Sequence, residues 1–408
     1  MSSLPPFTDS ADRSTRFLHS APRPASGDPL VQPLVQSTTF CQGGIGAGGH
    51  AYSRVSNPTV DALETALGSL ENAPPGVCFA SGLAAETALF LALLRAGDHC
   101  VCGRQVYGGT TRLLSQVFEG LGVRTTFVDS TSPQAVDEAI TADTRLVFVE
   151  TPANPTLDLT DIEAISRITR ERAIPLGVDN TFLTSAIQQP LDLGADISVY
   201  STTKFVDGHS AALGGAIVSR DPALLERVRF IRKSTGAIQS PLNAWLTLQG
   251  LKTLPLRIER QSQTGAALAQ WLLDRPGVRL VHHPSLATGE ARRIAERQHA
   301  GNLHGAVVTF ELDTEACDIH RFLGALRLCR LVEHVGSVET LITHPASMTH
   351  ADVPPAQRAE AGIADGLLRV SVGLENLADI TADLNRALEA SRSSVVTRRG
   401  EESCQPVA

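Results

Sequence analysis

Apolar residues between positions 57 and 219 follow two alternating spacings. From Asp61 to Leu70 they recur three and four positions apart, which predicts an amphipathic helix. Short continuous apolar runs follow, separated by further helical stretches, and such runs are typical of parallel strands buried under helices on both faces of a sheet. We therefore expect an α/β unit with a mostly parallel sheet, with strands at 77–80, 123–128, 146–149, 175–178, 197–200 and 216–218 and a buried helix at 83–94.

Beyond Arg220 the apolar positions indicate a different arrangement. A helical region extends from Asp221 to Arg275, and Pro255 inside it is a candidate for a kink. Separated elements then predict a smaller α+β unit, with strands at 307–312 and 367–372 and helices at 318–326 and 376–390. Roughly the first 15 residues and the stretch from Arg392 onward are polar, so both are expected to be flexible. The expected division is an N-terminal arm at 1–56, an α/β domain at 57–250, a C-terminal α+β domain at 251–391 and a flexible tail at 392–408.

Composition narrows the class of protein. The 408 residues are 42% hydrophobic and 19% charged, as expected for a soluble globular protein of two domains. Because the net charge is −8, cations are not in excess to neutralise phosphates, and nucleic acid is not expected as a partner. Apolar runs such as Ala88–Leu94 are far shorter than the roughly 20 residues that span a bilayer, so no membrane association is expected.

The cysteines indicate a reducing compartment. An odd number, seven, in a long chain favours free thiols, and residues 1–17 lack the pattern of a signal peptide, so we expect a cytoplasmic protein. Cys100 and Cys102 are spaced as a metal pair would be, but their spacing also suits two side chains on one face of a buried strand, which is the preferred interpretation. No metal site is expected.

Lysine is rare, and one lysine stands apart from the others. The chain has three: Lys233 and Lys252 lie in ordinary amphipathic surroundings, whereas Lys204 follows the apolar run 195–200 and the hydroxyl-rich residues 201–203. An amine at the end of a strand, next to hydroxyl groups, is placed to form a Schiff base. The alternative is a lysine that merely ends a strand.

Other polar groups follow the predicted strands, at the edge where ligands bind in parallel sheets. Ser81-Gly82-Leu83 opens a helix after the first strand and offers N–H groups to an anion, Asp179 follows a later strand, and Ser201 and Thr203 precede Lys204. A phosphate site, an acid and an amine together are what pyridoxal 5′-phosphate (PLP) requires. Taken singly, Asp179 would more often belong to a turn, and Ser81-Gly82 would more often be a simple helix start.

Residues 44–49 fit the G-x-G-x-x-G pattern of dinucleotide-binding proteins, but this match is rejected. That motif must open a helix, whereas here Pro58 delays the next helix. A flexible glycine-rich loop is the preferred interpretation.

The sequence resembles the Cys/Met-metabolism, or transsulfuration, family of PLP-dependent enzymes from about His19 to Leu388. The resemblance implies the aspartate-aminotransferase-like fold (fold type I): a large α/β domain with a mostly parallel sheet and a smaller C-terminal α+β domain. It rests on these stretches: Gln36–Phe40, Tyr52–Arg54, Asn57–Thr59, Tyr107–Thr110, Glu150–Pro155, Val178–Phe182, Ser201–Lys204, Gly208–Ser210 and Leu368–Gly373.

The resemblance implies roles for residues that would hold the cofactor. Lys204 would bind PLP and then move protons between substrate carbons, and Asp179 would keep the ring nitrogen protonated. The phosphate would be bound by Gly82, Leu83, Ser201 and Thr203, and by Tyr52 and Arg54 of the neighbouring subunit, which the arm at 1–56 would reach. This implies a homodimer as the smallest active unit, and a homotetramer built from two dimers. The alternative for Arg54 is a solvated loop arginine.

Other roles concern the substrate. Tyr107 would stack on the ring and could protonate the departing group, while Arg369, helped by Asn154, would bind the α-carboxylate. Arg112 and Glu333 match positions that bind the distal end of a long zwitterionic substrate in cystathionine-handling members. The alternatives are a turn residue for Asn154, an exposed helix arginine for Arg112 and a loop glutamate for Glu333.

The chain also departs from the family pattern. His334 replaces the usual serine of a Ser-Leu-Gly stretch, where it either alters specificity or fills space. Ala51, Gln105 and Ala211 replace usual acids, and Gly109 stands where methionine γ-lyases carry a cysteine, which disfavours methionine as substrate.

The resemblance implies PLP-dependent γ-carbon chemistry on sulfur amino acids. Cystathionine γ-lyase activity, which yields cysteine, 2-oxobutanoate and ammonia, is the leading expectation. Cystathionine γ-synthase or O-acylhomoserine sulfhydrylase activity is the alternative, and a non-catalytic PLP-binding regulator is a remote one.

Overall fold

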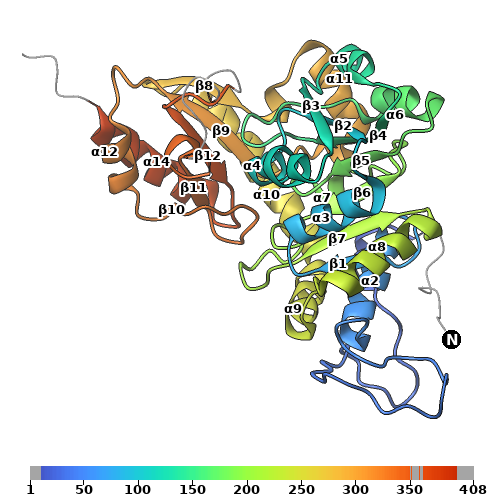
Figure 1. Cartoon of the computed structure of the whole chain (residues 1–408). Helices are drawn as coiled ribbons and strands as arrows, with labels where there is room; N and C mark the ends of the chain where they lie inside the picture. Colours follow the sequence, from blue (N-terminus) through green and yellow to red (C-terminus); the bar gives the residue numbers. More distant parts are fainter. Residues whose placement is uncertain (1–10, 350, 352–357, 359–361, 393–408) are drawn as a thin grey trace, which may run out of the picture.

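The computed structural model describes residues 11–349, 351, 358 and 362–392. The larger of its two units is built around a seven-stranded sheet (Figure 1). The spatial order of the strands is β1-β7-β6-β5-β4-β2-β3. All neighbouring pairs are parallel except those made by β7, which runs antiparallel to both β1 and β6. The strands are β1 (Val77–Phe79), β2 (His99–Gly103), β3 (Arg124–Val128), β4 (Thr144–Glu150), β5 (Leu176–Asp179), β6 (Ile197–Tyr200) and β7 (Gly215–Ser219). The predicted mostly parallel sheet is therefore confirmed.

Side chains alternate between two cores on the faces of this sheet. Cys100 and Cys102 on β2 are buried in a cluster with residues of α3 (Gly82–Leu93) and α8 (Pro222–Thr235). Val101, between them, is buried on the opposite face against α6 (Ile162–Glu171). Burial on both faces explains why most strands of the sheet are apolar runs without a polar side, whereas the edge strand β3 has exposed positions, and it confirms that the two cysteines belong to a buried strand.

Local signals explain where the main helices begin. The Asn57 side chain accepts a hydrogen bond from the Thr59 N–H (2.9 Å) and Pro58 occupies the first turn of α2 (Pro58–Leu70), while the Ser81 hydroxyl accepts from the Ala84 N–H (3.1 Å) at the start of α3. The other helices of the large unit are α4 (Gly108–Arg112), which continues as the π-helix Leu113–Phe118, α5 (Pro133–Ala139), α7 (Thr184–Ile187) and α9 (Pro241–Lys252).

The long helical region expected from Asp221 to Arg275 is wrong as a continuous unit. The chain forms three helices there, α8, α9 and α10 (Leu254–Leu273). The left-handed backbone of Gly236 (φ +77°) ends α8, and Ser240 caps α9. Pro255 lies in the first turn of α10 and therefore starts a helix instead of kinking one.

A five-stranded sheet confirms the predicted smaller α+β unit. Its order is β10-β11-β12-β9-β8, antiparallel except for the pair β10–β11. Its core includes Phe310, Phe322 and Leu384. The elements are β8 (Val278–His282), β9 (Val307–Leu312), β10 (Arg330–Leu331), β11 (Leu341–Thr343), β12 (Leu367–Ser371), α11 (Gly289–Gln298), α12 (Ile319–Ala325) and α14 (Leu377–Ser391).

Helix α10 connects the two units. Leu254 and Ile258, near its start, are buried in the core of the large unit, whereas Leu268 and Leu272, near its end, are buried in the core of the small one. Figure 1 shows α10 between the two sheets. One rigid helix thus contributes to both hydrophobic cores.

The N-terminal segment extends away from both sheets, at the bottom of Figure 1. Part of the stretch expected to be flexible is a helix, α1 (Arg13–Leu18), because Phe17 is buried and the Arg13 guanidinium donates to the Ala186 carbonyl (2.8 Å). Residues 44–49 form an irregular loop, as predicted. Residues 1–10 and the expected tail from 393 to 408 lie outside the described residues. None of the helices that the structure describes combines the length and the apolar character needed to cross a membrane.

Three buried histidines lie close together next to the small sheet. The rings of His299 and His304 are hydrogen-bonded through their Nδ1 atoms (3.0 Å), and the His283 ring contacts the Gly305 carbonyl (3.3 Å). Burial lowers the pKa of His283 to about 4 and that of His299 to about 3, and it also lowers the pKa of His304. These rings are therefore neutral in the folded protein near neutral pH.

This burial predicts acid sensitivity. An unfolded histidine binds a proton below about pH 6.5, whereas folded His283 does not until about pH 4, so folding stability falls as the pH decreases through this window. His283 should therefore cost about 2 kcal/mol of the free energy of unfolding between pH 7 and pH 5. His283→Asn keeps an acceptor for the Ser285 N–H and should lose less stability over this range, measured as thermal midpoints at both pH values. Exposed His320→Asn is the control, and an equal loss in H283N and wild type would contradict this explanation.

Candidate active site

A cavity of about 370 Å³ lies where the carboxyl ends of β4, β5 and β6 face the small sheet. Most of the predicted site residues line its wall, although they come from distant parts of the sequence. They are Gly82, Leu83, Tyr107, Arg112, Asn154, Asp179, Ser201, Thr203, Lys204, Glu333 and Arg369. These residues therefore surround one cavity in the structure, and the roles assigned to them stay predictions.

One end of the cavity is built to bind an anion. Helix α3 begins at Gly82, so the N–H groups of Gly82 and Leu83 have no partner within the helix. A Cβ on Gly82 would lie 2.9 Å from the Ser201 Cβ, so only glycine allows the helix to approach this closely. Thr203 is held on the other side by paired hydrogen bonds between its hydroxyl and the backbone of Gly214 (both 3.0 Å). Free N–H groups and the adjacent hydroxyls form a phosphate-sized cradle.

Lys204 lies in the turn after β6, beside a second positive charge and a neutral ring. Burial, and then the Arg369 charge, lower the pKa of Lys204 to about 8. Its Nζ is 3.3 Å from the Nδ1 of His334. Burial, Lys204 and Arg369 lower the pKa of His334 to about 4, so this ring is neutral and can accept from the ammonium group. Gly336 (φ +91°) packs against this turn, since a Cβ there would lie 2.7 Å from the Lys204 carbonyl carbon.

Asp179 ends β5 as a buried carboxylate without a cation bonded to it among the described residues. It accepts a hydrogen bond from the Thr181 N–H (2.9 Å). Burial raises its pKa to about 6, although hydrogen bonds from Thr181 oppose the shift. Such a group would be stabilised by a cation that enters the cavity.

Arg369 on β12 provides a buried guanidinium with unused donor capacity. It is 3% exposed and donates to Asn154 Oδ1 (2.7 Å) and Thr343 Oγ1 (3.1 Å). Its Nε has no hydrogen-bond partner among the described residues. Burial lowers its pKa to about 10, so it remains charged at neutral pH. The arrangement fits a planar anion such as a carboxylate, with Asn154 orienting the guanidinium.

Tyr107 precedes α4 and is held by a residue that was not predicted. The Glu150 carboxylate, at the end of β4, accepts a hydrogen bond from the Tyr107 N–H (2.6 Å). Burial raises the pKa of Glu150 well above its usual range, with Asp179 the second cause. Arg112, one turn after Tyr107, and exposed Glu333, after β10, contribute charges to the same wall.

Some wall residues were missed, and some predicted residues are not on the wall. The unpredicted polar members include Glu86, Glu150 and Thr181. Glu150 is the first residue of the stretch Glu150–Pro155, on which the family resemblance partly rests, so it could have been identified from the sequence. Glu86 lies inside a helix, where the sequence carries no local signal. His334 contacts Lys204 but does not line the cavity.

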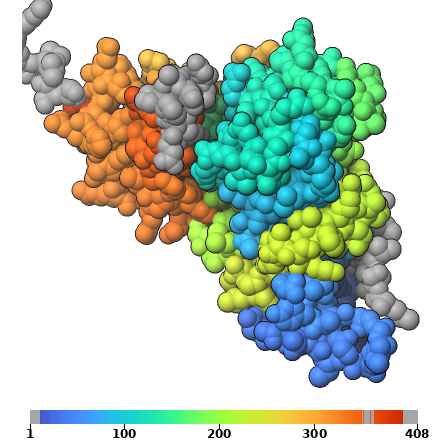
Figure 2. Space-filling model, viewed as in Figure 1, coloured from blue at the N-terminus to red at the C-terminus, as the bar shows by residue number. Residues whose placement is uncertain are grey.

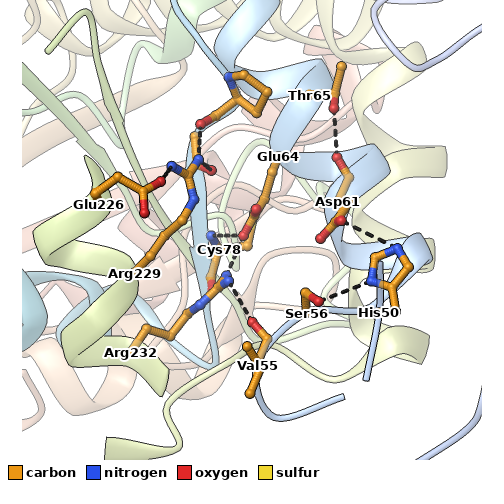
Figure 3. Close-up of polar contacts among 12 residues, drawn as sticks. His50, Val55, Ser56, Asp61, Glu64, Thr65, Cys78, Glu226, Arg229 and Arg232 are labelled. Atoms are coloured by element: carbon orange, nitrogen blue, oxygen red, sulfur yellow. Dashed lines mark hydrogen bonds and ion pairs between the residues drawn. The ribbon is translucent and has the colours of Figure 1, made fainter. Parts of the chain in front are cut away.

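Tyr52 and Arg54 also lie outside the cavity of their own chain. The Arg54 guanidinium is 5.2 Å from the Tyr52 ring and donates to the Lys233 carbonyl (2.7 Å) at the end of α8. Figure 3 shows how the adjacent arm residues are anchored: a buried ion pair joins Arg232 and Glu64, and Arg232 also donates to the Val55 carbonyl (3.3 Å). The same view shows His50 bonded to Ser56 (3.0 Å) and paired with Asp61.

The wall residues fit PLP on structural grounds. The cradle at Gly82 suits its phosphate, uncompensated Asp179 suits a protonated ring nitrogen, and Lys204 has a lowered pKa that favours the nucleophilic amine. Bound PLP supplies an electron sink that makes bonds next to the amino-acid α-carbon breakable. Among the described residues, no group of His, Cys, Asp and Glu side chains is placed to hold a metal ion.

Comparison with known proteins agrees with this fit. The family model for Cys/Met metabolism PLP-dependent enzymes matches residues 14–389. Cystathionine gamma-lyase of Bacillus subtilis (strain 168) is 41% identical over 88% of this chain and 93% of its own. Cystathionine gamma-synthase of Mycobacterium bovis is 42% identical over 92% of this chain and 96% of its own. The crystal structure of cystathionine gamma-lyase from Lactobacillus plantarum complexed with L-serine superposes with a TM-score of 0.90 at 36% identity, covering 93% of this chain and 99% of that one.

The chain belongs to the Cys/Met metabolism family of PLP-dependent enzymes. The expected fold type I, the PLP cofactor and the enzymatic nature of the protein are thereby confirmed. Relatives of nearly equal identity bear lyase and synthase names, so the comparisons define the family chemistry and not a single reaction.

The environment of Lys204 predicts a pH dependence for covalent PLP attachment. Only the neutral amine attacks the aldehyde, so attachment to apoenzyme should accelerate as the pH rises, with a midpoint near 8. Arg369→Gln removes one cause of the lowered pKa and should move the midpoint upward. Borohydride reduction followed by mass spectrometry of the Lys204 peptide measures attachment at each pH. Lys233→Arg is the control, and a midpoint that R369Q leaves unchanged would contradict the assigned cause.

Proposed function

We propose that this enzyme cleaves cystathionine at its γ-carbon, converting cystathionine and water to cysteine, 2-oxobutanoate and ammonia. The observation that carries the proposal is the distribution of charge around one cavity. Buried Arg369 suits an α-carboxylate, whereas exposed Glu333 and Arg112 on the same wall suit the ammonium and carboxylate at the far end of a long substrate. A short amino acid would use only one of these ends.

In this proposal the protein's own residues bind the substrate and move protons. Arg369 and Asn154 orient the α-carboxylate, which places the adjacent C–H bonds near Lys204. The Lys204 amine, with a pKa of about 8, takes protons from substrate carbon and returns them. The Tyr107 hydroxyl stands over the same cavity, where it can give a proton to the departing sulfur. Neutral His334 accepts from Lys204 and holds its Nζ in place.

A second candidate is γ-replacement, in which a thiol captures the substrate after an acyl group leaves. The relative named cystathionine gamma-synthase, 42% identical, favours it. The early steps of both reactions use the same residues, so Lys204, Tyr107 and Arg369 do not separate them. A non-catalytic PLP-binding regulator is disfavoured because all three are present in one cavity.

We also infer that the active site is shared between subunits of a homodimer that pairs into a tetramer. Residues 1–56 act as an arm, 57–250 as the PLP-binding domain and 251–391 as the C-terminal domain. Arm side chains Leu30 (87% exposed) and Ile45 are unusually exposed for apolar groups, which supports burial against another copy. Figure 2 shows the arm protruding at one end of the molecule. In the shared arrangement Tyr52 and Arg54 bind the phosphate of the neighbouring subunit's cofactor.

The reaction can be tested with a substrate panel. Purified enzyme given cystathionine alone should release 2-oxobutanoate and free thiol in equal amounts. Glu333→Gln should raise KM for cystathionine about tenfold, the cost of one charge-assisted contact, with little change for a short γ-substituted substrate. Glu339→Gln, an exposed acid outside the cavity wall, is the matched control.

The opposite result has a defined form. Absence of keto acid from cystathionine, together with thioether formation from O-succinylhomoserine and cysteine, would establish γ-replacement instead. PLP binding without turnover of any member of the panel would contradict both proposed reactions.

The shared site can be tested by mixing two inactive variants. Arg54→Ala removes the guanidinium that would bind the cofactor phosphate in the neighbouring subunit. Lys204→Ala removes the amine of the subunit's own site. If the sites are shared, refolded mixtures should regain roughly a quarter of wild-type activity, because half of the dimers are hybrids with one intact site. A mixture that stays as inactive as its components would show that each chain completes its own site.

A further inference from the structure

Glu86 is an acidic residue of the cavity wall for which the proposed reaction has no use. It lies in the second turn of α3, four residues after Gly82, and is 3% exposed. Its Oε2 accepts a hydrogen bond from the Thr110 hydroxyl (2.7 Å). Among the described residues this is the only hydrogen bond of the carboxyl group, so its second oxygen has no hydrogen-bond partner there.

The groups that face Glu86 make its charged form unfavourable. Asp179 at the end of β5 and Glu150 at the end of β4 are acids, and the Cys102 thiol on β2 is buried beside them. Burial, and then Asp179, raise the pKa of Glu86 to about 8, and only the Thr110 hydrogen bond lowers it. Glu86 is therefore protonated at neutral pH in the protein without cofactor.

Glu150 shows by contrast what Glu86 lacks. Glu150 is influenced by the Arg369 charge and accepts the Tyr107 N–H, so it has a structural task and a nearby cation. No arginine or lysine of the described chain bonds to Glu86 or contributes to its pKa shift. Among the described residues, no cation bonds to Glu86 or Asp179 or contributes to their pKa shifts.

We propose that Glu86 is a second acidic partner of the cofactor ring and loses its proton to solvent when PLP binds. The protonated ring nitrogen beside Asp179 brings one positive charge into the part of the cavity that lacks one. Attraction to this charge favours the carboxylate form of Glu86 and lowers its pKa. The balance is simple: the O–H bond of Glu86 breaks, the proton passes to water or buffer, and no other bond changes.

The consequence is a link between PLP affinity and pH. Since binding releases a proton from Glu86, affinity must rise with pH between the bound-state pKa and the cofactor-free value near 8. The rise can reach about tenfold per pH unit beyond what the cofactor's own titration contributes. This inference rests on the proposed placement of the ring beside Asp179, and it is independent of which substrate the enzyme uses.

Calorimetry of PLP binding to full-length apoenzyme tests the inference directly. Titrations at pH 7.5 in buffers of different ionisation enthalpy count the protons released per PLP bound. Wild type should release roughly 0.7 proton more than Glu86→Gln, a neutral variant of the same shape, given the pKa near 8. Glu119→Gln, an exposed acid just after the π-helix, is the matched control and should behave as wild type.

A second variant guards against a folding defect in E86Q. Thr110→Val removes the one hydrogen bond that lowers the pKa of Glu86, so the extra proton release should persist but move to higher pH. Equal proton counts in wild type and E86Q, with both proteins folded and binding PLP, would overturn the proposal. Asp179→Asn separates the two assumptions: if this variant binds PLP as tightly as wild type, the ring placement itself is wrong.

Discussion

Burial of charge without full compensation is the constraint on which this site depends. The cavity holds the amine of Lys204 beside the guanidinium of Arg369, and it holds three carboxyl groups whose pKa values are all raised. Each of these groups costs free energy to bury, and although the Arg369 charge favours ionised Glu150, no cation of the described residues bonds to Glu86 or Asp179. This cost is offset by the free energy of burying apolar side chains in the two large cores on either side of the sheet and in the third core, in the small unit. A charged cofactor then stabilises groups that the fold leaves unfavourable.

Sequence reasoning succeeded where a single element determines the outcome. Strands buried on both faces are continuous apolar runs, and chemistry at their carboxyl ends follows from the topology of a parallel sheet. Lys204, Asp179 and Gly82 were therefore identifiable before the structure was known. Lysine is rare in this chain, and Lys204, Asp179 and Gly82 all follow predicted strands and together fit one cofactor.

The misses have physical causes. Periodicity continues across short breaks, so α8, α9 and α10 resembled one helix, and the residues that separate them, Gly236 and Ser240, act through backbone conformation and capping. The antiparallel direction of β7 cannot be read from the sequence, because a strand that is buried on both faces is a continuous apolar run in either direction. Glu86 lies inside a helix. It can be identified as a candidate site residue only from its proximity to Asp179, which is more than ninety residues away in the sequence. Tyr52 and Arg54 face away from their own cavity, so a single chain does not show what they bind.

Helix α10 has a consequence for how specificity can change. Lys204 follows a strand of the large sheet and Arg369 lies on a strand of the small one, and the helix that is buried in both cores joins the two units that carry these cationic groups. Substitutions along α10 or under β12 would tilt one unit against the other and alter the room for a substrate, while the groups that break bonds stay in register. No residue of α10 lines the cavity, so changes in this helix can alter the space for a substrate while the residues of the cavity wall stay the same.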